Sequence, residues 1–96
     1  MKLLVRLQCL QDGRGTAFGT GYRPDWRSDR KPELNGAQVA LPRSVGTLAP
    51  GASADALLTP FDGSLWVGLV EVGDELRGYE GFTETVTGVV LEVFEP

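Results

Sequence analysis

The chain has 96 residues, of which 42% are apolar, which is enough for one small domain spanning residues 1–96. It has no histidine and a single cysteine, Cys9, which excludes serine–histidine and cysteine–histidine catalytic pairs, histidine-based metal sites and an intrachain disulfide. We expect a cytoplasmic protein, because no apolar run approaches the ~20 residues that cross a bilayer and the first residues turn polar too early for a signal peptide.

The net charge of −4 is distributed unevenly along the chain. Residues 1–43 carry eight basic and four acidic side chains, whereas residues 44–96 carry one basic and nine acidic side chains. Such segregation produces oppositely charged faces only where the fold keeps the two halves apart. A small barrel interleaves its strands, so the sequence leaves this separation open.

Six runs of strand length follow one another along the chain. Thirteen glycines and six prolines interrupt it too often for a helix with a continuous apolar stripe. Turn signals such as Asp12-Gly13 and Asp62-Gly63 separate the runs. The predicted strands cover residues 3–10, 22–27, 37–41, 54–61, 74–79 and 85–94. This pattern predicts an all-β barrel or sandwich, and closure into a barrel removes the free edges.

The first and last strands carry the clearest apolar alternation. In the first, the residues predicted to point inward are Leu3, Val5, Leu7 and Cys9. In the last, one predicted face holds Val89, Leu91 and Val93, and the other holds Val86, Val90 and Phe94. Cys9 is interpreted as a small buried apolar group, and Trp66 as a residue of the core or of a barrel end.

Residues 13–26, GRGTAFGTGYRPDW, hold four glycines in nine positions. Their spacing matches neither the G-x-G-x-x-G fingerprint of dinucleotide-binding folds nor the P-loop, and no lysine follows. Pro24 also forbids a helix interior at this point. We therefore predict no nucleotide cofactor and interpret the stretch as a glycine-rich connection that leads into an edge strand.

The same stretch resembles the start of domain III of bacterial elongation factor Tu, a translational GTPase. The family has Gly-Arg-His-Thr-Pro-Phe followed by Gly-Tyr-Arg-Pro-Gln-Phe, and the ungapped identities are Gly13, Arg14, Thr16, Phe18, Gly21, Tyr22, Arg23 and Pro24. Later segments keep the family's order and spacing, in NGAQVALP, LAPGA and ELRGYEGFTETVTGVVLEV. The resemblance covers essentially the whole chain and implies a single six-stranded antiparallel β-barrel that stands alone.

In this family, domain III has no active site. It packs against the nucleotide-binding domain and a second barrel, helps to hold the T stem of aminoacyl-tRNA and contacts the nucleotide-exchange factor. The family's histidine and glutamine at the tRNA surface correspond to Gly15 and Asp25 in this chain. One donor is therefore missing, and an acid stands where a phosphate would approach. The resemblance implies a preserved scaffold with an altered tRNA surface.

Candidate partner-binding residues cluster around this motif, because tyrosine, tryptophan and arginine concentrate binding energy at interfaces. They are Arg14, Tyr22, Arg23, Trp26, Arg27, Arg30 and Lys31. A structural alternative assigns Tyr22 and Arg23 to the stability of the barrel, with Arg23 paired to Glu33 or Glu75.

The acids of the C-terminal half allow two interpretations. They form either a solvated face that meets a basic partner or a carboxylate pair, such as Asp74 with Glu84, in a cleft. The acids are Glu71, Asp74, Glu75, Glu80 and Glu84. Their spacing does not match a calcium loop, and we predict no catalytic residue, no metal ligand and no cofactor.

The sequence favours a non-enzymatic protein-binding module. In one version it is an immunity or antitoxin-type protein that masks a toxin through its acidic face or through residues 27–31. In another version it is an accessory protein of translation that binds tRNA or partners of elongation factor Tu. A carboxylate-dependent enzyme is the third hypothesis.

Overall fold

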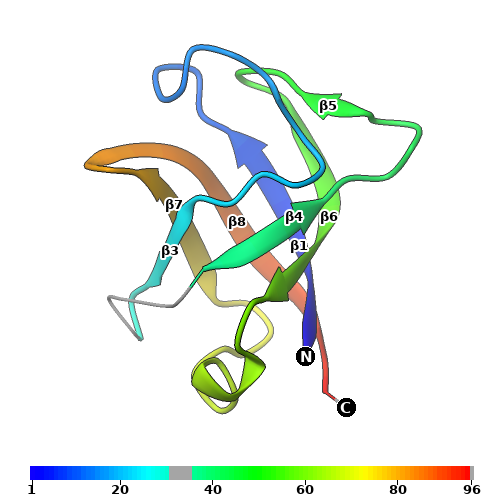
Figure 1. Cartoon of the computed structure of the whole chain (residues 1–96), viewed down its shortest axis with the longest axis vertical. Coiled ribbons are helices and arrows are strands. Elements are labelled where there is room, and N and C mark those ends of the chain that lie inside the picture. The colour runs from blue at the N-terminus through cyan, green and yellow to red at the C-terminus, as the bar shows by residue number, and fades with distance from the viewer. Residues whose placement is uncertain (31–35, 96) are drawn as a thin grey trace.

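The computed structural model describes residues 1–30 and 36–95, which fold as an all-β structure with one short 3-10 helix (Figure 1). The strands are β1 (Lys2–Cys9), β2 (Phe18–Gly19), β3 (Asp25–Ser28), β4 (Ala37–Ala40), β5 (Thr47–Leu48), β6 (Ser53–Pro60), β7 (Glu75–Glu80) and β8 (Thr83–Phe94), and the 3-10 helix η1 is Gly63–Leu65. Each predicted run corresponds to one of the six strands of the main sheet, with ends that shift by a few residues. The two-residue strands β2 and β5, which pair with each other, were not predicted.

The main sheet has six strands in the order β3-β7-β8-β1-β6-β4, and all its neighbours are antiparallel. Figure 1 shows the sheet curling until β4 crosses opposite β8 and β1. Two backbone hydrogen bonds join β4 to the segment before β3: Gly21 N–H donates to Val39 O at 2.8 Å, and Val39 N–H donates to Tyr22 O at 2.9 Å. The segment before β3 therefore reaches β4, and the prediction of an all-β, six-stranded antiparallel, barrel-like fold is confirmed.

The predicted inward row of β1 forms the centre of the apolar core. All four of its residues are 0% exposed, namely Leu3, Val5, Leu7 and Cys9. Burial raises the pKa of the Cys9 thiol, which keeps it neutral. Trp26 and Trp66 are the largest fully buried side chains, so the interpretation of Cys9 and Trp66 as core residues is confirmed.

Strand β8 contains a β-bulge at Leu91, because its register against β1 shifts by one residue between Leu4 and Val5. Beyond the bulge the alternation of β8 is inverted. Val93 packs against the core, whereas Phe94 is 43% exposed. The predicted faces of these two residues are therefore wrong, because a single extra residue exchanges the two faces of a strand.

Glycines serve two different purposes in this fold. At Gly88 in β8, an added Cβ would lie 2.5 Å from Val5 Cγ1 and 2.9 Å from Leu7 Cδ2, so the core leaves no space for a side chain. In the glycine-rich stretch, Gly15 and Gly21 have φ angles of +82° and +100°, which L side chains rarely adopt. The stretch is a turning connection that leads into edge strand β3, as predicted.

Candidate protein-binding surface

Basic residues of the N-terminal half meet acids of the C-terminal half in space. Arg14 Nε lies 3.1 Å from Glu80 Oε2, and Arg6 Nε lies 2.9 Å from Asp55 Oδ1. Arg6 and Asp55 are register partners on the neighbouring strands β1 and β6, and Arg14 reaches Glu80 of β7 from the connection between β1 and β2. Within the described residues, the two charge blocks of the sequence are therefore interleaved rather than separated into two faces.

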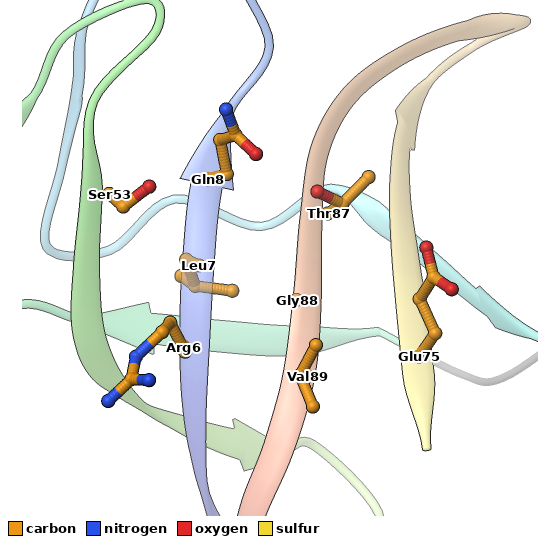
Figure 2. Close-up of a pocket in the computed structure, with 8 residues that line it drawn as sticks. All are labelled: Arg6, Leu7, Gln8, Ser53, Glu75, Thr87, Gly88 and Val89. Atoms are coloured by element: carbon orange, nitrogen blue, oxygen red, sulfur yellow. The ribbon is translucent and has the colours of Figure 1, made fainter. Parts of the chain in front are cut away.

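A shallow pocket of about 200 Å³ lies on the outer face of the sheet (Figure 2). Its floor is the backbone of Leu7 and Gly88, which are register partners. Its rims are formed by Ser53, Gln8, Thr87, Arg6, Val89 and Glu75. Glu75 is the one carboxylate among these lining residues, so the pocket lacks the pair of acids that carboxylate catalysis uses.

Tyr22 lies at the centre of a cluster that joins the glycine-rich stretch to the β7–β8 hairpin. Its ring stacks on Phe18 at a centroid distance of 4.3 Å, and the Arg14 guanidinium carbon lies 4.8 Å from its centre. The Tyr22 hydroxyl donates to Glu80 Oε2 and shares a hydrogen bond of 2.7 Å with Thr85 Oγ1. Burial, followed by the hydrogen bond to Glu80, raises the pKa of Tyr22 to about 12. Arg14 and Tyr22 thus take part in holding the barrel together.

Trp26 is a core residue and not an exposed anchor. Its side chain is 0% exposed, and its indole Nε1 donates a hydrogen bond of 3.2 Å to Ala37 O. This bond connects β3 to β4, the two end strands of the curled sheet. The prediction that Trp26 contacts a partner is therefore wrong, because the alternation of β3 turns its side chain inward.

Arg23 is exposed, and its guanidinium carbon lies 5.6 Å from the centre of the Phe61 ring. Such a cation–π contact contributes roughly 0.5–1 kcal/mol at an exposed site. The described part of the chain shows no ion pair between Arg23 and Glu75. Glu33, the other predicted partner of Arg23, lies outside the described residues.

Arg27 is half-buried and points outward from β3. Its guanidinium carbon lies 4.1 Å from the centre of the Tyr79 ring. The register of β3 with β7 places Arg77 directly opposite Arg27. The fold therefore brings together one predicted site residue and a second arginine that the sequence did not single out.

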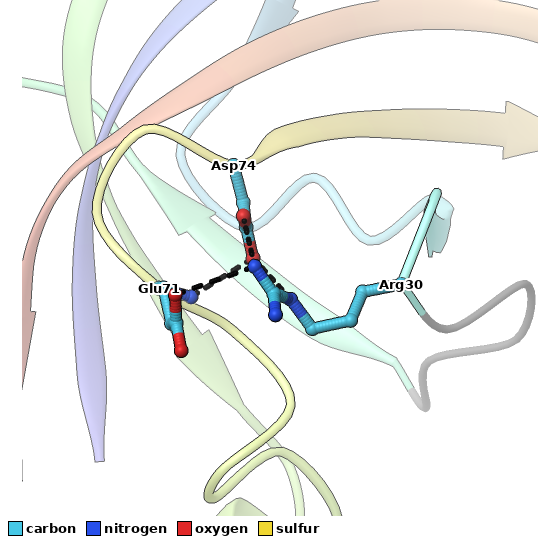
Figure 3. Close-up of polar contacts among 3 residues, drawn as sticks. All are labelled: Arg30, Glu71 and Asp74. Atoms are coloured by element: carbon cyan, nitrogen blue, oxygen red, sulfur yellow. Dashed lines mark hydrogen bonds and ion pairs between the residues drawn. The ribbon is translucent and has the colours of Figure 1, made fainter.

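Arg30 is held by two acids, as Figure 3 shows. Its Nη2 lies 3.0 Å from Asp74 Oδ1 and 3.3 Å from Glu71 Oε2, and its Nε donates to Asp74 Oδ2 at 3.2 Å. Asp74 Oδ2 also accepts a hydrogen bond of 2.9 Å from the Glu71 N–H. The hydrogen bonds from Arg30 lower the pKa of Asp74. Lys31, the last predicted site residue, lies outside the described residues.

Asp74 and Glu84 do not form the carboxylate pair that the enzyme hypothesis requires. Asp74 O accepts a hydrogen bond from Val90 N–H, whereas Glu84 is the register partner of Tyr79. The two acids therefore lie towards opposite ends of the β7–β8 hairpin. The lowered pKa of Asp74 is also opposite to the shift that a general acid needs. Among the described residues, no group of three or more His, Cys, Asp or Glu side chains could hold a metal ion.

Segment 61–73, between β6 and β7, exposes several large apolar side chains that the sequence did not identify as a surface. Trp66 and Val70 point into the core and are 0% and 5% exposed. The outward side chains are 58%, 45%, 52% and 64% exposed, for Phe61, Leu65, Val67 and Val72 respectively. The apolar run SLWVGLV in a region rich in turn residues is the signal that could have identified this surface.

A second exposed apolar group is Phe82, at the tip of the β7–β8 hairpin, where it is 100% exposed. The preceding residue, Gly81, has a φ of +62° and makes the turn. Glu80 lies on the other side of this glycine and is engaged by Arg14 and Tyr22. Phe82 therefore projects from a hairpin turn whose adjacent residue, Glu80, is held by the glycine-rich stretch.

No family model matches the chain, and no curated protein gives a match. In the described parts of the structure, no helix has the length and apolar character needed to cross a membrane.

Proposed function

We propose that the chain is a non-catalytic, cytoplasmic protein-binding module built on a barrel related to domain III of elongation factor Tu. The exposure of Phe61, Leu65, Val67 and Val72 on segment 61–73 carries this proposal. The burial of Trp66 within the same segment anchors it to the core. A contiguous segment that exposes several large apolar groups is typical of protein interaction sites.

The charged side chains of the barrel are less suited to binding a partner than the exposed apolar side chains of segment 61–73. Arg14 is paired with Glu80, and Arg30 is paired with Glu71 and Asp74. A partner attracted to these charges would have to compete with ion pairs that already exist within the barrel. Apolar contact needs no such competition, because burial of exposed apolar area on binding is favourable by itself.

The favoured version is an immunity or antitoxin-type protein that covers a toxin with the apolar segment 61–73. This version suits a small acidic chain in which the absence of histidine removes the commonest catalytic groups. An accessory role in translation is the second version, and the resemblance of GRGTAFGTGYRPDW to elongation factor Tu favours it. Partners of the elongation factor would then be the proteins bound.

A pull-down from the native lysate tests the proposal. The bait is the wild-type chain, the double variant Val67→Ser/Val72→Ser, or the control variant Val45→Ser, whose valine is 36% exposed outside the segment. We expect mass spectrometry to find proteins that the wild type and the control retain and the double variant loses. A toxin among them supports the first version, and a translation component supports the second.

Thermal unfolding of the three baits shows whether each variant is folded. Equal recovery of the same proteins with all three baits would exclude segment 61–73 as the docking surface. A gel shift of tRNA at low salt that disappears steeply with added salt would instead favour an RNA-binding protein.

A further inference from the structure

Arg27 and Arg77 lie together on the outer face of the sheet. They are register partners in the antiparallel pairing of β3 with β7. The adjacent side chains Trp26 and Leu76 are 0% exposed and point inward, so the two arginines point outward. Directly opposite residues have their Cβ atoms about 5 Å apart. The fold therefore places the bases of two guanidinium side chains next to each other.

Neither arginine of this pair has a hydrogen-bonded carboxylate within the described chain. Arg77 Nε and Glu84 Oε1 form a long ion pair at 3.7 Å, a distance that exceeds a hydrogen bond. No described acid lies within 4.0 Å of Arg27. By contrast, carboxylates lie within 3.1 Å of Arg6, Arg14 and Arg30. Like charges at opposite positions destabilise a sheet, so an external anion bound here would relieve repulsion as well as form new bonds.

Tyr79 orients one of the two guanidinium groups. The Arg27 guanidinium carbon lies 4.1 Å from the centre of the Tyr79 ring. An arginine that lies over an aromatic ring keeps its N–H donors available for an acceptor with two oxygens. Thr87 is the register partner of Arg77 on β8 and also lines the pocket of Figure 2. Its hydroxyl adds a further donor in the same cross-strand row.

We propose that Arg27 and Arg77 form an oxyanion site that binds the carboxylate of an acidic side chain from the protein partner. A carboxylate accepts two parallel hydrogen bonds from one guanidinium group, and its negative charge reduces the repulsion between the two arginines. Asp25 and Glu75 point outward from the same two strands. Their negative charge disfavours a polyanion such as nucleic acid, which brings many phosphates, more than it disfavours one carboxylate. That this carboxylate belongs to a protein partner rests on the proposed protein-binding function.

A nuclear magnetic resonance titration of the purified, isotope-labelled chain tests this site. The probes are a triglutamate peptide, inorganic phosphate and tRNA, all at matched ionic strength. We expect triglutamate to shift the Nε–Hε signals of Arg27 and Arg77. The variant Arg27→Gln/Arg77→Gln should bind the peptide about tenfold more weakly or worse, since hydrogen bonds to charged groups are lost. The control variant Arg43→Gln changes an exposed arginine between β4 and β5 and should bind as the wild type does.

The dispersion of the amide signals shows that each variant is folded before it is titrated. Equal affinity of wild type and double variant for triglutamate would overturn the site, as would shifts on strands other than β3, β7 and β8. Stronger binding of phosphate or of tRNA than of triglutamate would overturn the assignment of a carboxylate ligand. The titration uses no cellular partner, so its failure is distinguishable from a failure of segment 61–73 in the pull-down.

Discussion

Trp26 and Trp66 are two fully buried tryptophans that differ in one hydrogen bond. The same substitution at both positions therefore measures what that hydrogen bond contributes. Both side chains are 0% exposed. Trp26 Nε1 donates to Ala37 O at 3.2 Å, whereas Trp66 Nε1 is buried with no acceptor in the described part of the chain. Replacement of either residue by phenylalanine keeps an aromatic ring in the core and removes the indole N–H.

The hydrogen bond should make Trp26→Phe the more costly change. Both variants lose a similar apolar area, so this contribution cancels in the comparison. Loss of the bond costs about 1 kcal/mol, and the buried Ala37 carbonyl loses its indole donor. Trp66→Phe instead removes an unsatisfied donor whose burial costs about 1–3 kcal/mol. We therefore expect the free energy of unfolding to fall by about 2–4 kcal/mol more in Trp26→Phe than in Trp66→Phe.

Urea unfolding followed by far-ultraviolet circular dichroism measures this difference without relying on tryptophan fluorescence. In a domain of this size, 2 kcal/mol also lowers the melting temperature by about 8–16 °C. An equal or larger loss of stability in Trp66→Phe would refute the reasoning. Trp26→Ala removes the whole indole and should cost about 3–5 kcal/mol. A loss of partner binding in that variant would therefore report unfolding and not a missing contact.

Two further predictions concern packing and pH. Gly88→Ala should lower the free energy of unfolding by about 1–3 kcal/mol, because its Cβ would lie 2.5 Å from Val5 Cγ1. The double variant Gly88→Ala/Val5→Ala should lose less stability than the two single variants lose together, because Val5→Ala removes the colliding methyl group. Additive losses of stability in urea unfolding would contradict this collision. Arg30 lowers the pKa of Asp74 below 3.8, so the pair stabilises the fold above that pH and the stabilisation is lost as the pH falls through the lowered value. Asp74→Asn should flatten the acid decline of the melting temperature, and an unchanged decline would exclude this ion pair as a cause.

The candidate site was only partly predictable, because residue type indicates a capacity for binding and not its use. Arg14 and Tyr22 were singled out for their composition, yet the partner that engages both of them is Glu80, more than fifty residues away. Arg27 was predicted as a partner-binding residue, but its neighbour Arg77 was recognised as a candidate only from the register of β3 with β7. Such pairings across the sheet leave no mark in the local sequence.

The surface of segment 61–73 was missed for a related reason. Its apolar run holds both the buried Trp66 and the exposed Val67. The closing of the barrel end decides which of these neighbours faces the core. Hydropathy alone assigns both to the interior.

By itself, the sequence determined the six strand positions and the inward row of β1. Alternation with a period of two and turns at glycine and proline are properties of short segments, so they survive without knowledge of the neighbours. The absence of histidine likewise removed a class of chemistry before any fold was known. Tertiary structure alone decided the inverted face beyond Leu91, the burial of Trp26 and the capture of Arg30 by Asp74. Each of these outcomes depends on which strand lies beside which and in what register, and that choice is made by the packing of the whole barrel.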